Sequence, residues 1–306
     1  MKNIAIIGSG SFGCSLAYVL NKKNRVRIWS YTKEEKDYIN KKHKCLKNKN
    51  IKLDKELICF DNMKDVLNDS DYIILVSPSK TIRNICKEIK KYYNNEEIII
   101  ASKGIENDKL LSNIVEEELS NKISIITGPS YPLDIIHDKD IYLEYSGNKD
   151  IKELFNKTHI NLNYNKDFIG LELGGAFKNI VSIMIGLVEG LNKNNLISYV
   201  VVESLREIQE IGKKLNAKED TFDNISCLGE IIGAIYSSES RNKKAGLLLS
   251  KNMKKEEIEK KINMVVEGFS TLDSCKYIID KYKLDLPLIN KLYEIVYENK
   301  SPSTFI

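Results

Sequence analysis

The sequence predicts an α/β protein with a doubly wound sheet in its N-terminal part and an all-α C-terminal part. From residue 1 to about 165, short β-rich runs alternate with helical segments, and after about residue 166 the strand signals stop. Runs such as Tyr72-Ile-Ile-Leu-Val76 are apolar on both faces, which is typical of parallel strands covered by helices. A length of 306 residues also favours about two domains. We therefore expect one domain over 1–165 and a second over 166–306.

Each expected element is a short apolar or amphipathic run. The strands cover residues 4–7, 26–29, 57–60, 72–76, 98–101, 123–126, 141–143 and 160–162. Helical patterns in the first part include 80–93 and 107–120. Those in the second part cover roughly 168–192, 196–214, 228–238, 241–250, 255–262, 269–282 and 287–298, with Ser270 and Pro287 as boundary signals.

The chain opens with a strand, a glycine turn and an apolar-faced helix. The turn reads Gly8-Ser9-Gly10-Ser11-Phe12-Gly13 and is followed by an apolar run to Leu20. In this pattern Gly8 permits the tight turn, Gly10 lets the backbone approach a pyrophosphate, and Gly13 lets helix and strand pack closely. The anion would rest on N–H groups at the helix N-terminus. The motif predicts a Rossmann-like, dinucleotide-binding domain; the alternative is a tight turn that binds nothing.

Composition excludes several functional classes. The net charge of +4, from 47 basic and 43 acidic residues, is too small to imply nucleic acid, and no basic stripe is interleaved with aromatics. The six cysteines are scattered without a CxxC motif or a His/Cys cluster, which favours a reducing cytoplasm and argues against a metal site. The N-terminus lacks a signal-peptide pattern, and no uninterrupted apolar stretch approaches 18 residues, so we expect a cytoplasmic protein without stable membrane insertion.

Loops after the later strands carry residues suited to chemistry, because ligands of such sheets bind at the carboxyl ends of the strands. Lys103 lies between a buried strand and a glycine, where it could meet a phosphate or a carbonyl oxygen, although a single lysine is usually surface. Gly128-Pro129 forces a sharp exit, and Ser130 could contact a ligand or simply cap the next helix. The loop 76–79 could belong to the site or could equally be a plain connector.

Two further clusters lie in the helical part. Gly175, Lys178 and Asn179 share one helix face at i, i+3 and i+4. Because a glycine inside a helix costs roughly 1 kcal/mol relative to alanine, the Gly174-Gly175 pair predicts the close approach of a ligand or another backbone. The run Ser240-Arg241-Asn242 is typical of a helix N-terminus, where a hydroxyl, N–H groups and an arginine could hold a phosphate.

These pieces, in this order, resemble the NAD(P)-dependent sn-glycerol-3-phosphate dehydrogenase family of bacterial type, from the N-terminus to about residue 300. The resemblance is carried by GSGSFGCSLA (8–17), SKGIE (102–106), GPS (128–130), ELGGAFKNIVSIMIGLVEGL (172–191), SRNKKAG (240–246) and VVEG (265–268). It implies interconversion of glycerol 3-phosphate and dihydroxyacetone phosphate by hydride transfer with NAD or NADP, in support of glycerophospholipid synthesis. We also expect a homodimer.

The resemblance also implies residue roles. Lys178 matches the general acid/base, a role that requires a neutral amine, and Lys103 is the candidate for the nearby positive charge that favours it. The implied substrate-binding residues are Lys103, Gly128, Ser130, Lys178, Glu230, Ser240, Arg241 and Asn242. The implied cofactor-binding residues are Gly8, Gly10, Ser11, Phe12, Gly13, Tyr31, Lys103, Pro132, Arg241, Val265 and Glu267. No metal is implied.

Departures from the family pattern leave alternatives open. Glu230 stands where the family usually has Asp, and Pro132, which has no N–H, replaces a small residue. The end of the second strand has no acid before Glu34 to bind a ribose 2′-hydroxyl, and Lys33 could attract a 2′-phosphate, which favours NADP slightly. The alternatives are a related reductase of another anionic hydroxy compound and a non-catalytic dinucleotide-binding regulator; retention of Lys178 argues against the latter.

Overall fold

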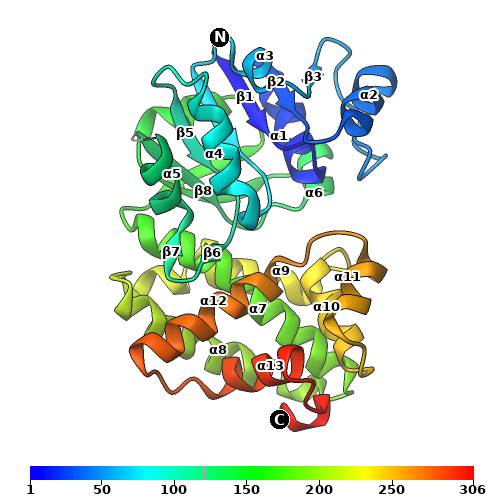
Figure 1. Ribbon diagram of the computed structural model, residues 1–306, viewed down its shortest axis with the longest axis vertical. Coiled ribbons are helices and arrows are strands. Elements are labelled where there is room, and N and C mark those ends of the chain that lie inside the picture. The colour runs from blue at the N-terminus through cyan, green and yellow to red at the C-terminus, as the bar shows by residue number, and fades with distance from the viewer. Residues whose placement is uncertain (120–121) are drawn as a thin grey trace. The chain divides into compact units, whose positions relative to one another are not determined.

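A computed structural model describes residues 1–119 and 122–306 of the chain. Two compact units are distinguished by their internal contacts: Met1–Ser102 with Leu111–Lys166, and Lys103–Leu110 with Asp167–Ile306 (Figure 1). The short segment Lys103–Leu110 thus belongs with the C-terminal residues, an arrangement that no pattern in the sequence indicated.

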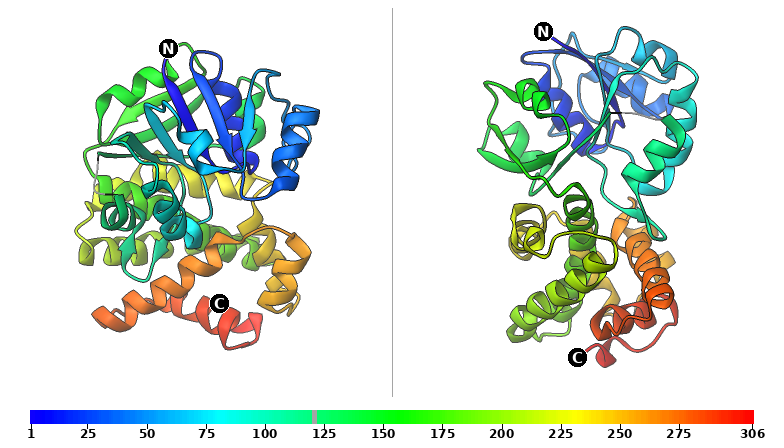
Figure 2. Two further views of the ribbon diagram at one scale, coloured as in Figure 1. Left: turned by 45° about the horizontal axis from the view of Figure 1, so that its top comes forward. Right: turned by 90° about the vertical axis from the view of Figure 1, so that its left-hand side faces the viewer.

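The first unit is built on one sheet (Figure 2). Every predicted strand is present in that sheet. Its order is β10-β9-β8-β5-β4-β1-β2-β3, and all described neighbours pair in parallel except β8 with β9. The order from β3 through β1 to β4, β5 and β8 is that of a doubly wound Rossmann sheet, which confirms the predicted fold class. The strands are β1 (Asn3–Ile7), β2 (Arg25–Trp29), β3 (Ile58–Phe60), β4 (Tyr72–Leu75), β5 (Glu97–Ile100), β8 (Ile123–Thr127), β9 (Ile141–Ser146) and β10 (Ile160–Tyr164).

Helices cover both faces of this sheet because successive side chains along a strand point to opposite faces and are apolar on both. Ile6 and Ile74 join the apolar cluster that contains α1, whereas their neighbours Ile7 and Ile73 join the cluster of α3, α4 and α5. The helical segments are α1 (Ser11–Leu20), α2 (Lys33–Lys42), α3 (Met63–Leu67), η1 (Ser79–Thr81), α4 (Ile82–Lys90), α5 (Leu111–Leu119), α6 (Pro132–Ile136) and η2 (Lys149–Phe155).

The helical stretch predicted over 107–120 is wrong in its first turn. The chain there forms a hairpin of β6 (Ile105–Glu106) and β7 (Lys109–Leu110), and α5 begins only at Leu111. Asn107 has φ of 55°, a left-handed conformation that asparagine tolerates in turns and that interrupts a helix. Ser120, the last residue of the predicted stretch, lies outside the described residues.

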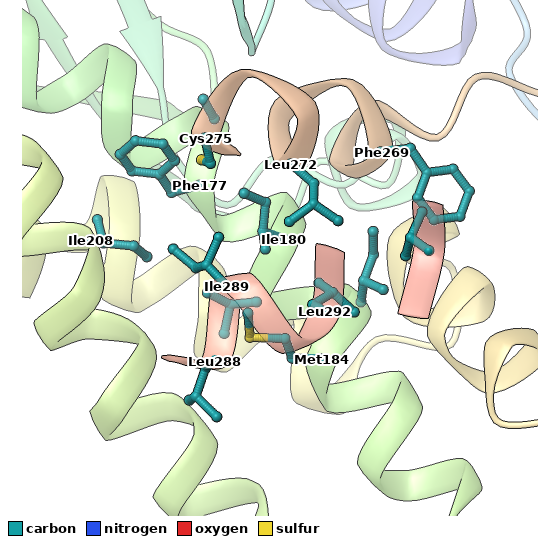
Figure 3. Packing of buried hydrophobic residues seen from close by; sticks show 14 of the residues in the cluster. Phe177, Ile180, Met184, Ile208, Phe269, Leu272, Cys275, Leu288, Ile289 and Leu292 are labelled. Atoms are coloured by element: carbon teal, nitrogen blue, oxygen red, sulfur yellow. The ribbon is translucent and has the colours of Figure 1, made fainter. Parts of the chain in front are cut away.

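The second unit is a bundle of helices around α7, and each helical stretch predicted there corresponds to a helix. Figure 3 shows Phe177, Ile180 and Met184 of α7 packed with side chains from α12 and α13. Ile105 and Leu110 of the hairpin complete the same apolar core. The elements are α7 (Phe168–Gly190), η3 (Asn194–Leu196), α8 (Ile197–Lys214), η4 (Glu219–Asp223), η5 (Ile225–Gly229), α9 (Glu230–Tyr236), α10 (Arg241–Leu249), α11 (Lys255–Ile262), α12 (Glu267–Tyr282), α13 (Pro287–Tyr297) and η6 (Pro302–Thr304).

Helix α7 is more apolar than the sequence reasoning allowed for. Within the described residues it alone has the length and composition of a membrane span, with a mean hydropathy of 1.5 over an 18-residue window, whereas the sequence predicted no such segment. Of that window, 94% is buried inside the protein, as in the core helix of a bundle.

Candidate active site

The three glycines of the first turn have three different surroundings. Gly8 has φ of 136°, and a Cβ there would lie 2.6 Å from the carbonyl oxygen of Val76. A Cβ on Gly13 would lie 2.0 Å from the carbonyl oxygen of Gly8, so only glycine lets α1 pack this closely on β1. A Cβ on Gly10 would meet no heavy atom within 4 Å. The open side of Gly10 is therefore a cradle that fits a ligand group, as the sequence pattern predicts for a pyrophosphate.

The N-terminus of α1 points its amides into the same turn. The helix starts at Ser11, its N-cap is Gly10, and none of the described side chains caps it. Ser11 and Phe12 are half-buried. Uncapped first-turn N–H groups and the helix dipole both favour a bound anion, so this end of α1 suits a dinucleotide phosphate.

An acidic side chain that the sequence reasoning missed lies beside this turn. Glu35 is in the first turn of α2, and its Oε2 accepts hydrogen bonds from Ser9 Oγ at 2.5 Å and from Ser30 Oγ at 3.2 Å. The exposed ring of Tyr31 packs edge-on against Trp29, with centroids 6.2 Å apart. The spacing Thr-x-x-Glu from residue 32 to 35 is a helix-start signal that could have placed Glu35 next to the end of β2.

The loop after β8 differs in one respect from its prediction. Ser130 does not cap α6, since its Oγ donates to the carbonyl oxygen of Gly128 at 3.1 Å and Tyr131 is the N-cap. Gly128 has φ of 140°. Pro132 is the first residue of α6, where a missing N–H is no loss, and its carbonyl accepts from Ser15 Oγ of α1 at 3.2 Å. Pro132 therefore joins α6 to the helix that carries the glycine turn.

In the second unit, three ionic side chains from distant parts of the chain meet at one point. Lys103 precedes β6, Lys178 lies in the middle of α7, and Glu230 is the first residue of α9. Lys103 Nζ donates to Glu230 Oε1, and Lys178 Nζ lies 2.7 Å from Glu230 Oε2. The side chain of Glu230 is 2% exposed, while those of Lys103 and Lys178 keep 18% and 15%. One carboxylate thus holds two ammonium groups, and the cluster carries a net positive charge.

Burial and charge act in opposite directions on this cluster. Burial alone raises the pKa of the Glu230 carboxyl, but the charges of Lys103 and Lys178 outweigh it and hold that pKa below its ordinary value. Burial lowers the pKa of Lys103; Glu230 opposes this effect and the charge of Lys178 adds to it. The carboxylate therefore remains ionised at neutral pH.

A close approach of two helical segments brings Glu230 to Lys178. A Cβ on Gly174 of α7 would lie 2.9 Å from Cys227 Cβ, so glycine lets the turn η5 lie against α7. The expectation of a close approach at this glycine is therefore confirmed, with protein as the partner. The turn η5 is a π-helical turn, a feature frequent at functional sites, and it ends immediately before Glu230.

The predicted cluster Ser240-Arg241-Asn242 is joined to Asn179 of α7, the residue that follows Lys178. Asn242 Nδ2 donates to Asn179 Oδ1 at 2.7 Å, and the N–H of Gly268 donates to Asn242 Oδ1 at 3.0 Å. Ser240 caps α10, as predicted, by accepting from the N–H of Lys243 at 3.2 Å. Lys178 and Asn179 therefore link the ionic cluster to the start of α10.

Helices α7 and α10 pack through two glycines, which explains this link. A Cβ on Gly186 would lie 2.0 Å from the carbonyl oxygen of Lys243, and one on Gly246 would lie 2.0 Å from that of Ile183. At the N-terminus of α10, the exposed Arg241 donates from Nη1 to the carbonyl oxygen of Val265 at 3.0 Å. Glu267 follows as the first residue of α12.

The predicted site residues thus gather in two places, one in each unit. The first unit holds those of the glycine turn, the end of β2 and the loop after β8. The second unit holds Lys103, Lys178, Glu230 and the residues around the start of α10 and α12. All six cysteines are buried thiols, and within 1–119 and 122–306 no three His, Cys, Asp or Glu side chains are grouped to hold a metal ion.

Comparison with known proteins matches nearly the whole chain. Residues 3–140 match a family profile described as the N-terminus of NAD-dependent glycerol-3-phosphate dehydrogenase, and residues 167–306 match that of its C-terminus. A glycerol-3-phosphate dehydrogenase (NAD(P)+) of Clostridium botulinum is 35% identical, with 100% of this chain and 96% of the relative covered. The protein of the same name from Fusobacterium nucleatum is 31% identical, with coverages of 98% and 94%. A crystal structure of glycerol-3-phosphate dehydrogenase from Coxiella burnetii matches with a TM-score of 0.95 and 26% identity, over 99% of this chain and 97% of that chain. The chain belongs to the NAD-dependent glycerol-3-phosphate dehydrogenase family.

Proposed function

We propose that this protein is an oxidoreductase that interconverts sn-glycerol 3-phosphate and dihydroxyacetone phosphate with NAD(P)(H). The observation that carries the proposal is the meeting of Lys103, Lys178 and Glu230, in a member of a family named for this reaction. An enzyme of this class supplies glycerol 3-phosphate for glycerophospholipid synthesis.

Lys178 is the residue proposed to move the proton. In the direction of reduction, its ammonium group donates a proton to the carbonyl oxygen of the substrate as that oxygen gains negative charge. In the direction of oxidation, the neutral amine removes the proton of the secondary hydroxyl. Glu230 Oε2, 2.7 Å from Lys178 Nζ, fixes the position of the amine, and the same carboxylate also holds Lys103.

The substrate is an anion, and the second unit offers it two positively charged places. The ionic cluster has a net positive charge, and Arg241 with the amides of the start of α10 offers a second cationic end. Gly128, Ser130, Ser240 and Asn242 stay predictions as further substrate contacts, on the family resemblance.

The dinucleotide is assigned to the glycine turn of the first unit. Gly8, Gly10 and Gly13 shape the turn, and the amides of Ser11 and Phe12 at the start of α1 suit its pyrophosphate. When bound, the nicotinamide supplies or accepts the hydride. Tyr31, Lys103, Pro132, Arg241, Val265 and Glu267 remain predicted cofactor contacts.

Four accompanying expectations are proposals of the same kind. A net charge of +4 gives no reason to expect a nucleic-acid partner, and burial of α7 favours a protein without membrane insertion. The cysteines are scattered in the sequence and buried as thiols, which suits the cytoplasm. The homodimer is a prediction that light scattering on the purified chain would test.

The test is oxidation of NADH and of NADPH by the purified chain with dihydroxyacetone phosphate, each cofactor run separately. Turnover is expected, and Lys178→Ala should abolish it, while the matched control Lys251→Ala, at an exposed lysine, should not. Cofactor binding without turnover would support a non-catalytic regulator. Turnover only with another phosphorylated ketone or a keto acid would move the assignment to a related reductase.

A further inference from the structure

The carboxylate of Glu35 occupies a specific place in the first unit. One of its oxygens, Oε2, is held by two buried hydroxyls, Ser9 Oγ at 2.5 Å and Ser30 Oγ at 3.2 Å. The other oxygen, Oε1, lies 3.3 Å from Lys47 Nζ. The side chain of Glu35 keeps 13% exposure, so the carboxylate is anchored without being sealed from solvent.

The two hydroxyls that anchor Glu35 identify the part of the fold that it faces. Ser9 lies between Gly8 and Gly10 in the glycine turn, and Ser30 immediately follows β2. In dinucleotide-binding sheets of this order, the ribose next to the adenine lies by these same two segments, and an acid at the end of the second strand accepts its 2′-hydroxyl. Here the end of the second strand has a serine, and the acid reaches the same place from the first turn of α2.

The charges around this point favour a ribose over a 2′-phosphate. A 2′-phosphate carries up to two negative charges and would approach a carboxylate that two hydroxyls hold in place. The cation paired with Glu35 is Lys47, whose side chain is 46% exposed and can yield Oε1 to a ribose hydroxyl. Lys33, the residue that favoured NADP from the sequence, is exposed at the first position of α2.

We propose that Glu35 selects NAD over NADP, by accepting the ribose 2′-hydroxyl at Oε1 and repelling a 2′-phosphate. The proposal rests on the dinucleotide site assigned above. It replaces the slight preference for NADP, which depended on finding no acid before Glu34 at the end of the second strand.

The test is titration of the protein with NADH and with NADPH, followed by cofactor fluorescence, for the wild type, Glu35→Gln and Glu34→Gln. The wild type should bind NADH more tightly. Glu35→Gln should shift the ratio of the two Kd values towards NADPH by on the order of tenfold or more, because the repulsion of two unit charges about 4 Å apart corresponds to roughly fivefold in bulk water and to more near a protein surface. Glu34→Gln removes the same charge from an exposed neighbour in the same helical turn and should change the ratio by less than about twofold.

A measurement on the wild type alone covers the case in which Glu35→Gln fails to fold. Adenosine 5′-monophosphate should displace NADH more readily than adenosine 2′,5′-bisphosphate does. Equal or stronger displacement by the bisphosphate, or tighter binding of NADPH than NADH, would overturn the proposal. Binding of both dinucleotides with an unchanged Kd ratio in Glu35→Gln would refute the role of Glu35 alone, whereas binding of neither would also refute the dinucleotide site.

Discussion

Replacement of Glu230 by glutamine removes the charge that holds two lysines while keeping the shape of the side chain. In the wild type, one carboxylate oxygen pairs with Lys103 and the other lies 2.7 Å from Lys178 Nζ. Glutamine offers a single neutral oxygen and an amide N–H₂ group that would face an ammonium. The variant therefore leaves two positive charges close together with little to neutralise them.

The expected loss of stability follows from how buried the cluster is. Removing one partner of a buried ion pair costs about 3 to 5 kcal/mol. Because the lysine side chains keep 18% and 15% exposure, water can replace part of the pairing, and we expect the lower end, about 3 kcal/mol. At about 2 to 4 °C per kcal/mol for a domain of this size, Tm should fall by roughly 6 to 12 °C. Turnover should fall by about 100-fold, because Lys178 loses the group that fixes its position.

Thermal unfolding followed by circular dichroism, together with steady-state kinetics, measures both effects. Glu230→Asp is the matched control, since it keeps the charge and should lose far less stability. The pKa of the Glu230 carboxyl is held below its ordinary value by the two lysines, so pairing stabilises the fold above about pH 4.5 and is lost as the pH falls further. The stability gap between wild type and Glu230→Gln should therefore narrow in acid. A glutamine variant that melts within 2 °C of wild type at neutral pH, on the order of 0.5 kcal/mol, would refute the reasoning.

Other perturbations test separate parts of the structure. Lys178→Ala should lower kcat by on the order of 1,000-fold while NADH binding measured by fluorescence changes less than about twofold; near-normal turnover would exclude Lys178 as the base. Gly186→Ala should cost about 1 to 3 kcal/mol in chemical denaturation and weaken substrate binding, because its Cβ would lie 2.0 Å from a carbonyl oxygen of α10. The control Gly229→Ala, whose Cβ would meet nothing closer than 3.6 Å, should be neutral or slightly stabilising, and equal losses in both would contradict the packing argument. Glu207, buried against two amides of α13, has its pKa raised to about 7 by burial, which those amides oppose. Between pH 5 and pH 7 the Glu207 carboxyl therefore keeps its proton in the folded state and loses it in the unfolded state, so the free energy of unfolding should fall by up to about 2 kcal/mol over this range. In urea titrations, Glu207→Gln should remove this dependence of stability on pH.

Much of the fold could be predicted because its strands are apolar on both faces and its opening turn has a distinctive glycine spacing. The hairpin after β5 could not, because strands of two residues have no period to detect. Its turn depends on the left-handed backbone of Asn107, and asparagine alone does not reveal that conformation.

The site was predicted less completely, for a different physical reason. Lys103 and Glu230 are 127 positions apart, and only the order of the family's motifs indicated that they act together. Glu35 was not predicted because an acid was expected at the end of the second strand, whereas Glu35 lies in the first turn of the following helix, α2. Ser130 has the residue type of a helix cap, but its hydroxyl is already used by the carbonyl oxygen of Gly128.

The segment Lys103–Leu110 has a consequence for how this gene could be divided. Its Ile105 and Leu110 fill the core of a unit whose other residues begin at Asp167, and its Lys103 is a partner of Glu230. A chain that starts at Asp167 would contain all the helices of that unit. It would still lack Ile105 and Leu110 from the apolar core and Lys103 from the ion pair with Glu230. The helical unit is therefore not an independent module, because part of its core is synthesised well before its helices. A chimaera that joins these helices to another dinucleotide-binding domain must keep the segment Lys103–Leu110.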